Sequence, residues 1–192
     1  MSPSPDCGET SYKGQNRLEG RNALVTGGDS GIGRAAAIAY AREGANVAIQ
    51  YLPGEEEDAN QVKKIIEDEG HKALLLPYDL REDNAATEIV EKTVTEFGGL
   101  DILVLNAAQQ IAHTSLSDLP MEQVHDTFKV NIISMFESVK AAEKHLEPGS
   151  AIITTTSVQS FDPSIPLIDY AATKGAISNF TVTLSKYFAD KG

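Results

Sequence analysis

The chain has 192 residues, of which 41% are hydrophobic and 23% are charged, and its formal net charge is −12. This length indicates one domain with a sizeable core, and the composition is that of an ordinary globular protein. The acidic excess argues against nucleic-acid or anionic-membrane partners, because both need a basic face. No apolar run approaches the ~20 residues of a membrane span.

The first 17 residues are expected to form a flexible extension. Their start, Met1–Pro5, has neither a basic region nor an apolar core, so we expect no signal peptide. The lone cysteine, Cys7, cannot form an internal disulfide, which fits a cytoplasmic location. The four histidines lie in separate segments without metal-ligand spacing, and we therefore expect no metal site.

A glycine-rich loop follows the first apolar run, Ala23–Val25, and precedes the helix-forming stretch 34–39. It reads Thr26-Gly27-Gly28-Asp29-Ser30-Gly31-Ile32-Gly33. A helix amino terminus behind such a loop presents backbone N–H groups to a pyrophosphate. The alternative is an ordinary strand-to-helix turn, but the strand and helix context favours phosphate binding. A P-loop is excluded because no Gly-Lys-Ser/Thr ends the loop.

Apolar runs then alternate with helical stretches. Strands are predicted where such runs follow a glycine that ends a helix, at residues 45–49, 73–76, 100–105 and 151–155. Nearly continuous apolar strands separated by helices indicate an α/β fold with a doubly wound parallel sheet, a Rossmann-like three-layer arrangement. The acidic run 55–58 is expected to begin a solvated helix.

Three residues near the end of the chain carry candidate chemistry. Tyr170 and Lys174 are four residues apart, which places both side chains on one helix face. A neighbouring Lys⁺ favours the phenolate over the phenol. Ser157 follows the β-branched run 152–156 and should lie at the carboxyl end of a strand. There its hydroxyl could hold a carbonyl oxygen while Tyr170 gives or takes a proton.

These motifs together resemble the short-chain dehydrogenase/reductase family. The matching positions are the glycine loop, the segment 106–108, Asn131, and Ser157 with Tyr170 and Lys174. The segments 51–58 and 107–110 resemble those of a bacterial subgroup of general-stress and aldehyde-reductase-like members. The resemblance implies one dinucleotide-binding and catalytic domain over 18–192. The family continues into further strands beyond this point, so the chain is expected to be a fragment or incomplete at its carboxyl end.

The resemblance also implies a role for each matching residue. Ser157 would bond the substrate oxygen, Tyr170 would move the proton, Lys174 would bond the nicotinamide ribose, and Asn131 would position a relay water. The cofactor would contact Gly27, Asp29, Ser30, Gly31, Ile32, Gly33, Tyr51, Asp79, Leu80, Asn106, Ala107, Ala108, Tyr170 and Lys174.

The choice between NAD and NADP stays open at this stage. An acidic residue about twenty positions beyond the glycines would hold the NAD ribose, and an arginine would accept the NADP phosphate. The corresponding residues 50–52, Gln-Tyr-Leu, include neither an acidic residue nor an arginine. Ala108 stands where the family usually has glycine, so we expect a slightly altered backbone approach to the cofactor and intact cofactor binding.

The expected reaction transfers a hydride between nicotinamide and a small aldehyde, ketone or sugar-like alcohol. One rival is a non-catalytic dinucleotide-binding or assembly module left by truncation. A second rival, an epimerase or dehydratase, usually spaces its loop as T-G-x-x-G-x-x-G, which this chain does not. The helix at about 168–189 carries more apolar surface than one sheet face needs, so we expect a homodimer or homotetramer. The alternative is that all of this helix's apolar surface packs against the sheet.

Overall fold

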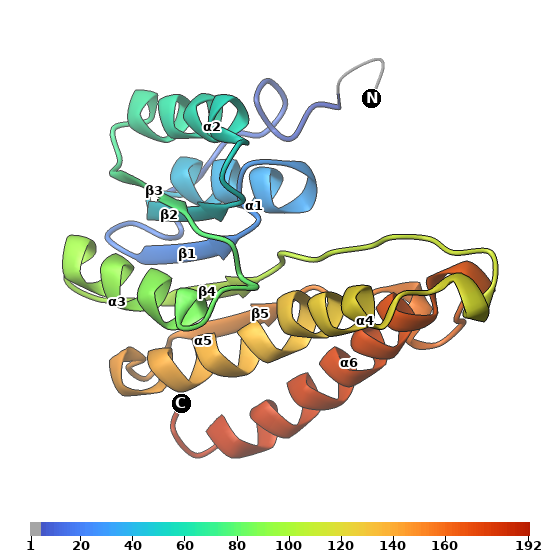
Figure 1. Ribbon diagram of the computed structural model, residues 1–192. Coiled ribbons are helices and arrows are strands. Elements are labelled where there is room, and N and C mark those ends of the chain that lie inside the picture. Colours follow the sequence, from blue (N-terminus) through green and yellow to red (C-terminus); the bar gives the residue numbers. More distant parts are fainter. Residues whose placement is uncertain (1–4) are drawn as a thin grey trace.

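A computed structural model describes residues 5–192 and contains one five-stranded parallel sheet (Figure 1). The strand order is β3-β2-β1-β4-β5. The strands are β1 (Asn22–Thr26), β2 (Asn46–Tyr51), β3 (Ala73–Pro77), β4 (Ile102–Leu105) and β5 (Ala151–Thr154). The chain reverses direction across the sheet between β1 and β4, the point at which such sheets bind ligands.

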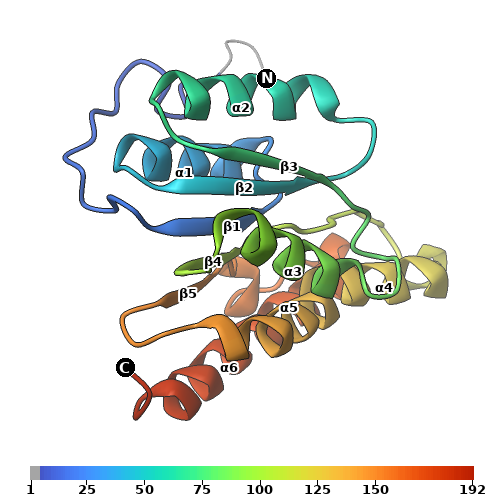
Figure 2. The same cartoon turned by 90° about the vertical axis from the view of Figure 1, so that its left-hand side faces the viewer.

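Helices cover both faces of the sheet (Figure 2). On one face lie α1 (Gly31–Arg42) and α2 (Glu56–Asp68). On the other lie α3 (Ala85–Phe97), α5 (Ser134–Ala142) and α6 (Ile168–Phe188). The predicted three-layer α/β fold is therefore confirmed. None of the helices within residues 5–192 is long and apolar enough to cross a bilayer.

The apolar side chains of the central strands are buried in two cores, one on each face of the sheet. Alternate residues of the central strands enter opposite cores: Ala23 and Val25 pack with α1 and α2, and Leu24 packs with α3, α5 and α6. All three side chains are fully buried. A strand that is buried on both faces needs a nearly continuous apolar run, and β4 is apolar throughout while β1 and β2 have apolar centres flanked by polar residues.

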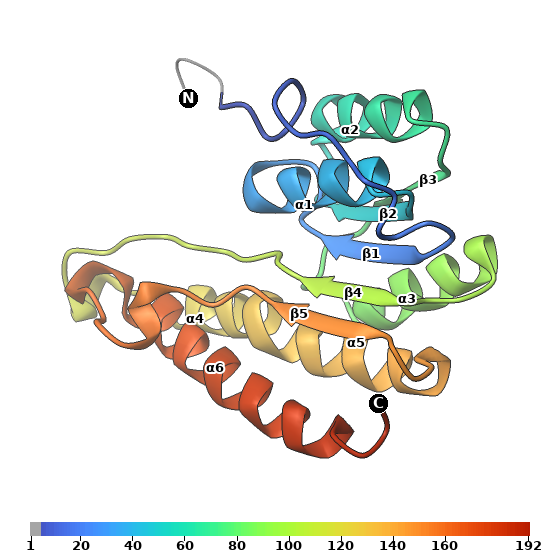
Figure 3. The same cartoon turned by 180° about the vertical axis from the view of Figure 1, so that it is seen from behind.

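The segment before β1 runs along α1 (Figure 3). The Glu43 carboxylate accepts hydrogen bonds from the Tyr12 hydroxyl, from Arg17 Nε at 3.0 Å and from the backbone N–H of Gln15 at 3.0 Å. Arg42 donates to three carbonyl oxygens of residues 8–12. The division of the chain at residues 17 and 18 stays a prediction.

A long connection leads from β4 to the helices of the candidate site. It includes a short 3-10 turn, η1 (Leu116–Asp118), and ends at α4 (Met121–Phe128). Between α4 and α5 the helix widens into one π-helical stretch, η2 (Lys129–Ile133). Three further 3-10 turns are η3 (Glu143–His145), η4 (Val158–Ser160) and η5 (Ile165–Leu167). The long connection and the start of α6 lie at the same end of the molecule (Figures 1 and 3).

Candidate active site

The glycine loop forms one wall of a cleft at the carboxyl ends of β1, β2 and β4. Gly33 lies so close to the loop that a Cβ added there would be 1.9 Å from the carbonyl oxygen of Gly27. A Cβ on Gly28 would be 2.6 Å from the Ile49 side chain. Ser30 precedes α1 and makes no side-chain cap for its first N–H groups. The amino end of α1 therefore opens toward the cleft, as an anion site requires.

The cleft has a volume of about 450 Å³. Most of the predicted cofactor residues line it, namely Gly27, Asp29, Ser30, Tyr51, Asp79, Leu80, Asn106, Ala107 and Ala108. Gly31, Ile32 and Gly33 start α1 next to this lining. The lining also includes Gln50, Glu55 and Arg81, which the sequence analysis did not assign as cofactor contacts. The sequence signal that could have identified them is their position at or just after the predicted strands β2 and β3.

Asn106 ties three strand ends together. Its backbone N–H donates to Thr26 Oγ1 at 2.9 Å, and its side-chain amide donates to the carbonyl oxygens of Thr26 and Gly27 at 3.2 and 3.3 Å. Its Oδ1 accepts a 3.0 Å bond from the Thr155 hydroxyl. This polar network holds β1, β4 and β5 in register around the cleft. Thr26 and Thr155 were not predicted as site residues.

The end of β5 is held against α6 by a ladder of hydrogen bonds. Thr156 Oγ1 donates to the carbonyl oxygen of Lys174 at 3.0 Å, and Ser160 Oγ lies 2.8 Å from Ser178 Oγ. Ser157 begins the η4 turn, where its hydroxyl accepts a 3.2 Å bond from the N–H of Gln159. The η4 turn packs on α6, so Ser157 lies beside the helix that carries the tyrosine and lysine.

Lys174 is a buried cation. Its side chain is 1% exposed, and Nζ donates a 2.7 Å hydrogen bond to the carbonyl oxygen of Thr155. Burial lowers the pKa of Lys174 to about 8. Nζ also lies 5.3 Å from the centre of the half-buried Tyr170 ring. The four-residue spacing therefore places the ammonium over the tyrosine ring.

Asn131 is fully buried within the π-helical stretch η2. Its Oδ1 accepts the N–H of Gln109 at 2.7 Å, and its Nδ2 donates to the Gln109 carbonyl at 3.0 Å and to Thr173 Oγ1 at 3.1 Å. The side chain thus joins the loop after β4 to α6. A π-bulge in a helix often marks a functional position.

Asp169 fixes the start of α6 just before Tyr170. Its carboxylate accepts hydrogen bonds from Thr127 Oγ1 at 2.8 Å, Gln123 Nε2 at 3.1 Å and the N–H of Tyr170 at 2.9 Å. Burial opposes ionisation, but these donors outweigh it and lower the pKa of Asp169. Sequence reasoning missed this residue, because its partners on α4 lie more than forty positions away.

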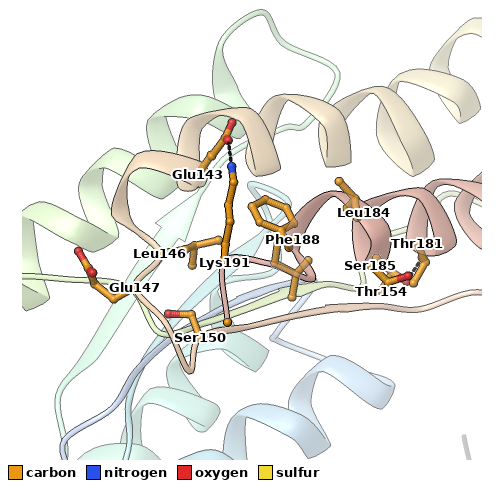
Figure 4. A pocket seen from close by; sticks show the side chains of 12 residues that line it. Glu143, Leu146, Glu147, Ser150, Thr154, Thr181, Leu184, Ser185, Phe188 and Lys191 are labelled. Atoms are coloured by element: carbon orange, nitrogen blue, oxygen red, sulfur yellow. Dashed lines mark hydrogen bonds and ion pairs between the residues drawn. The ribbon is translucent and has the colours of Figure 1, made fainter.

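A separate cavity of about 200 Å³ lies at the other end of α6 (Figure 4). It is lined by Leu184 and Phe188, and Lys191 Nζ lies 2.8 Å from Glu143 Oε1 at its edge. At ~1.5 Å of rise per residue, about 27 Å of helix separates Phe188 from Tyr170. This cavity has no part in the candidate site. Within residues 5–192 no group of three or more His, Cys, Asp or Glu could hold a metal ion.

A family model described as short chain dehydrogenase matches residues 21–192. The chain belongs to the short-chain dehydrogenase family. It is 58% identical over 192 residues to the "Uncharacterized oxidoreductase YhxD" of Bacillus subtilis, covering all of this chain and 64% of YhxD. It is 51% identical to "General stress protein 39" of the same organism, covering all of this chain and 67% of that protein. The predicted family and its general-stress subgroup are confirmed.

A solved structure has the same fold. It is a short-chain dehydrogenase from Burkholderia cenocepacia in complex with NADP, with a TM-score of 0.86 and 37% identity. The match covers 92% of this chain and 71% of that one. The chain therefore spans about two thirds of the length of these relatives.

Proposed function

We propose that the protein is an NAD(P)-dependent oxidoreductase acting on a small carbonyl or alcohol substrate, an aldehyde, ketone or sugar-like alcohol. The observation that carries this proposal is that Thr155 joins the buried Lys174, 5.3 Å from the Tyr170 ring centre, to Asn106 in the lining of the glycine-walled cleft. Family membership and the oxidoreductase names of the relatives support it.

The cleft fits a dinucleotide. Its glycine loop leaves no room for a Cβ at Gly28 or Gly33, so backbone N–H groups can approach a pyrophosphate closely. The residues that would hold the cofactor are those predicted from the sequence, with Lys174 and Asn106 on the nicotinamide side. When bound, the cofactor supplies or accepts the hydride.

The protein side of the reaction is a proton transfer at the Tyr170 oxygen. In reduction the phenol donates its proton to the substrate oxygen, and in oxidation the phenolate accepts it. The Lys174 ammonium lies 5.3 Å from the centre of the Tyr170 ring and would bond the nicotinamide ribose. The Ser157 hydroxyl orients the substrate oxygen. Asn131, held by Gln109 and Thr173, would position the relay water.

The proposal includes an assembly. An apolar groove of about 750 Å³ runs between α5 and α6, and Phe136 at its edge is 55% exposed although its ring centre is 4.1 Å from that of Phe180. We propose that a second copy of the chain covers this groove around a two-fold axis, giving a homodimer or homotetramer. A cytoplasmic location stays a prediction.

The test measures consumption of NADH and NADPH with a panel of small aldehydes and ketones, alongside cofactor binding by calorimetry. Turnover of any of these carbonyls with bound cofactor is the expected result. Cofactor binding without turnover of any member of the panel would instead favour the non-catalytic binding module. Absence of binding would reject both.

A further inference from the structure

We propose that the cleft prefers NAD over NADP, and that Asp29 and Glu55 set this preference by placing two carboxylates where the extra 2′-phosphate of NADP would lie. The inference rests on the proposed function, because it takes the cleft to be the dinucleotide site. It addresses the choice between NAD and NADP, which residues 50–52 at the end of β2 left open in the sequence analysis.

The two carboxylates border the adenosine end of the cleft. In dinucleotide-binding sheets the ribose 2′ position is read at the end of the second strand. Asp29 lies in the glycine loop after β1, and Glu55 is the residue that precedes α2, just beyond β2. Both line the cleft together with Tyr51 and Leu52. They come from different loops, so only the fold shows that they share this wall.

The residues at the end of β2 do not themselves recognise the ribose 2′ position. Gln50 has its amide occupied: Oε1 accepts the N–H of Gly27 at 3.0 Å, and Nε2 donates to the carbonyl oxygen of Tyr78 at 2.7 Å. The Tyr51 side chain is buried, with 4% of its surface exposed. In this chain the acidic groups at the ribose therefore come from the loops on either side of the strand.

The charge around this wall is negative. Asp29 is only 3% exposed, and burial together with the like charge of Asp29 raises the pKa of Glu55. The two carboxylates thus already repel each other. A phosphate monoester adds roughly −1.5 to −2 charges at neutral pH, and the wall would oppose it further. A ribose 2′-hydroxyl, in contrast, can donate a hydrogen bond to a carboxylate.

The nearby cations already have acidic partners. Arg81 is the only Lys or Arg among the described lining residues, and its Nη2 lies 2.5 Å from Asp79 Oδ2. Arg34, at the start of α1, donates from Nε to Glu9 at 2.8 Å. Its other nitrogens lie 3.3 Å from Gln61 Oε1. Recruiting either arginine to a 2′-phosphate would break an existing ion pair. The Burkholderia relative in complex with NADP has the same fold, so the fold alone does not decide the cofactor.

The experiment titrates NADH and NADPH against the parent protein, Glu55→Gln, Asp29→Asn and the control Glu57→Gln. Glu57 is an exposed carboxylate on α2 outside the cleft, so its variant has the same change in net charge. We expect the parent to bind NADH about tenfold or more tightly than NADPH. Glu55→Gln should improve NADPH binding severalfold and leave NADH within about twofold, because it removes mainly repulsion. Asp29→Asn should shift the ratio in the same direction, and Glu57→Gln should not shift it.

Three outcomes would overturn the inference. Equal or tighter NADPH binding by the parent rejects the preference while leaving the proposed oxidoreductase function intact. An equal shift in Glu55→Gln and Glu57→Gln assigns the effect to net charge and rejects the role of these two residues. Failure of the parent to bind either cofactor rejects the inference together with the proposed function.

Discussion

Lys174 is anchored to the end of β5 through Thr155, whose carbonyl oxygen accepts a 2.7 Å hydrogen bond from its Nζ. The same threonine donates its hydroxyl to Asn106 at 3.0 Å. One strand end therefore positions both the buried ammonium and the amide that braces the glycine loop. Placing a cation there has a cost in stability, because the low-dielectric surroundings disfavour its charged form.

The first prediction concerns this cost. Because burial lowers the pKa of Lys174 from 10.5 to about 8, the folded state binds fewer protons than the unfolded state between those pH values. The contribution of Lys174 to stability therefore rises with pH across this window. Methionine does not titrate, so the free energy of unfolding of Lys174→Met lacks this pH dependence. Relative to the parent, the variant should therefore become less stable by about 2 kcal/mol between pH 7 and pH 9.5.

Urea unfolding at both pH values measures this difference. Lys64→Met is the control, because the Lys64 side chain is 74% exposed and its difference from the parent should change little with pH. A Lys174→Met difference that is the same at both pH values would contradict the buried-cation account. The variant should also lose catalytic activity whatever its stability.

The second prediction concerns the proton donor. Tyr170→Phe keeps the ring and removes the oxygen, so turnover should fall by about 10²–10⁴ while the cofactor dissociation constant changes little. Steady-state rates and calorimetric titration test the two parts separately. Tyr40→Phe in α1 is the control and should keep its activity. If Tyr170→Phe retained more than a tenth of the parent rate, the tyrosine would not be the acid-base group.

The third prediction concerns the close approach in the glycine loop. Gly33→Ala would place a Cβ 1.9 Å from the Gly27 carbonyl oxygen, so the loop must move. We expect a loss of about 1–3 kcal/mol in stability and weaker binding of both cofactors. Gly175→Ala, in α6, is the control: its added Cβ has nothing within 4 Å, and a helix interior gains up to about 1 kcal/mol from this change. Thermal unfolding and cofactor titration distinguish the two.

The fourth prediction concerns assembly through α5 and α6. Phe136→Glu introduces a charge into the apolar groove and should convert an oligomer into monomers at micromolar concentration. Phe161→Glu is the control, since Phe161 is 80% exposed and lies outside the groove. Light scattering on both variants and the parent gives the masses. A parent that is monomeric, or a Phe136→Glu variant with unchanged mass, would reject this interface.

Some features of the protein were determined by the sequence alone because they depend on neighbours along the chain. The glycine loop between an apolar run and a helix former predicted β1 and α1, and both are observed. The four-residue spacing of Tyr170 and Lys174 placed them on one helix face, and the structure has them in the first turns of α6. These are local properties: chain stiffness, hydrogen bonding within a helix and the side-chain repeat.

Other features were decided only by the tertiary structure. The strand order, the bonding of Gln50 to the loop and to Tyr78, and the shared wall of Asp29 and Glu55 join residues that lie 23 or more positions apart. Periodicity also could not separate the part of α6 that faces the sheet from the part that lines the apolar groove. Such contacts depend on how the whole chain packs, and no pattern within one segment contains that information.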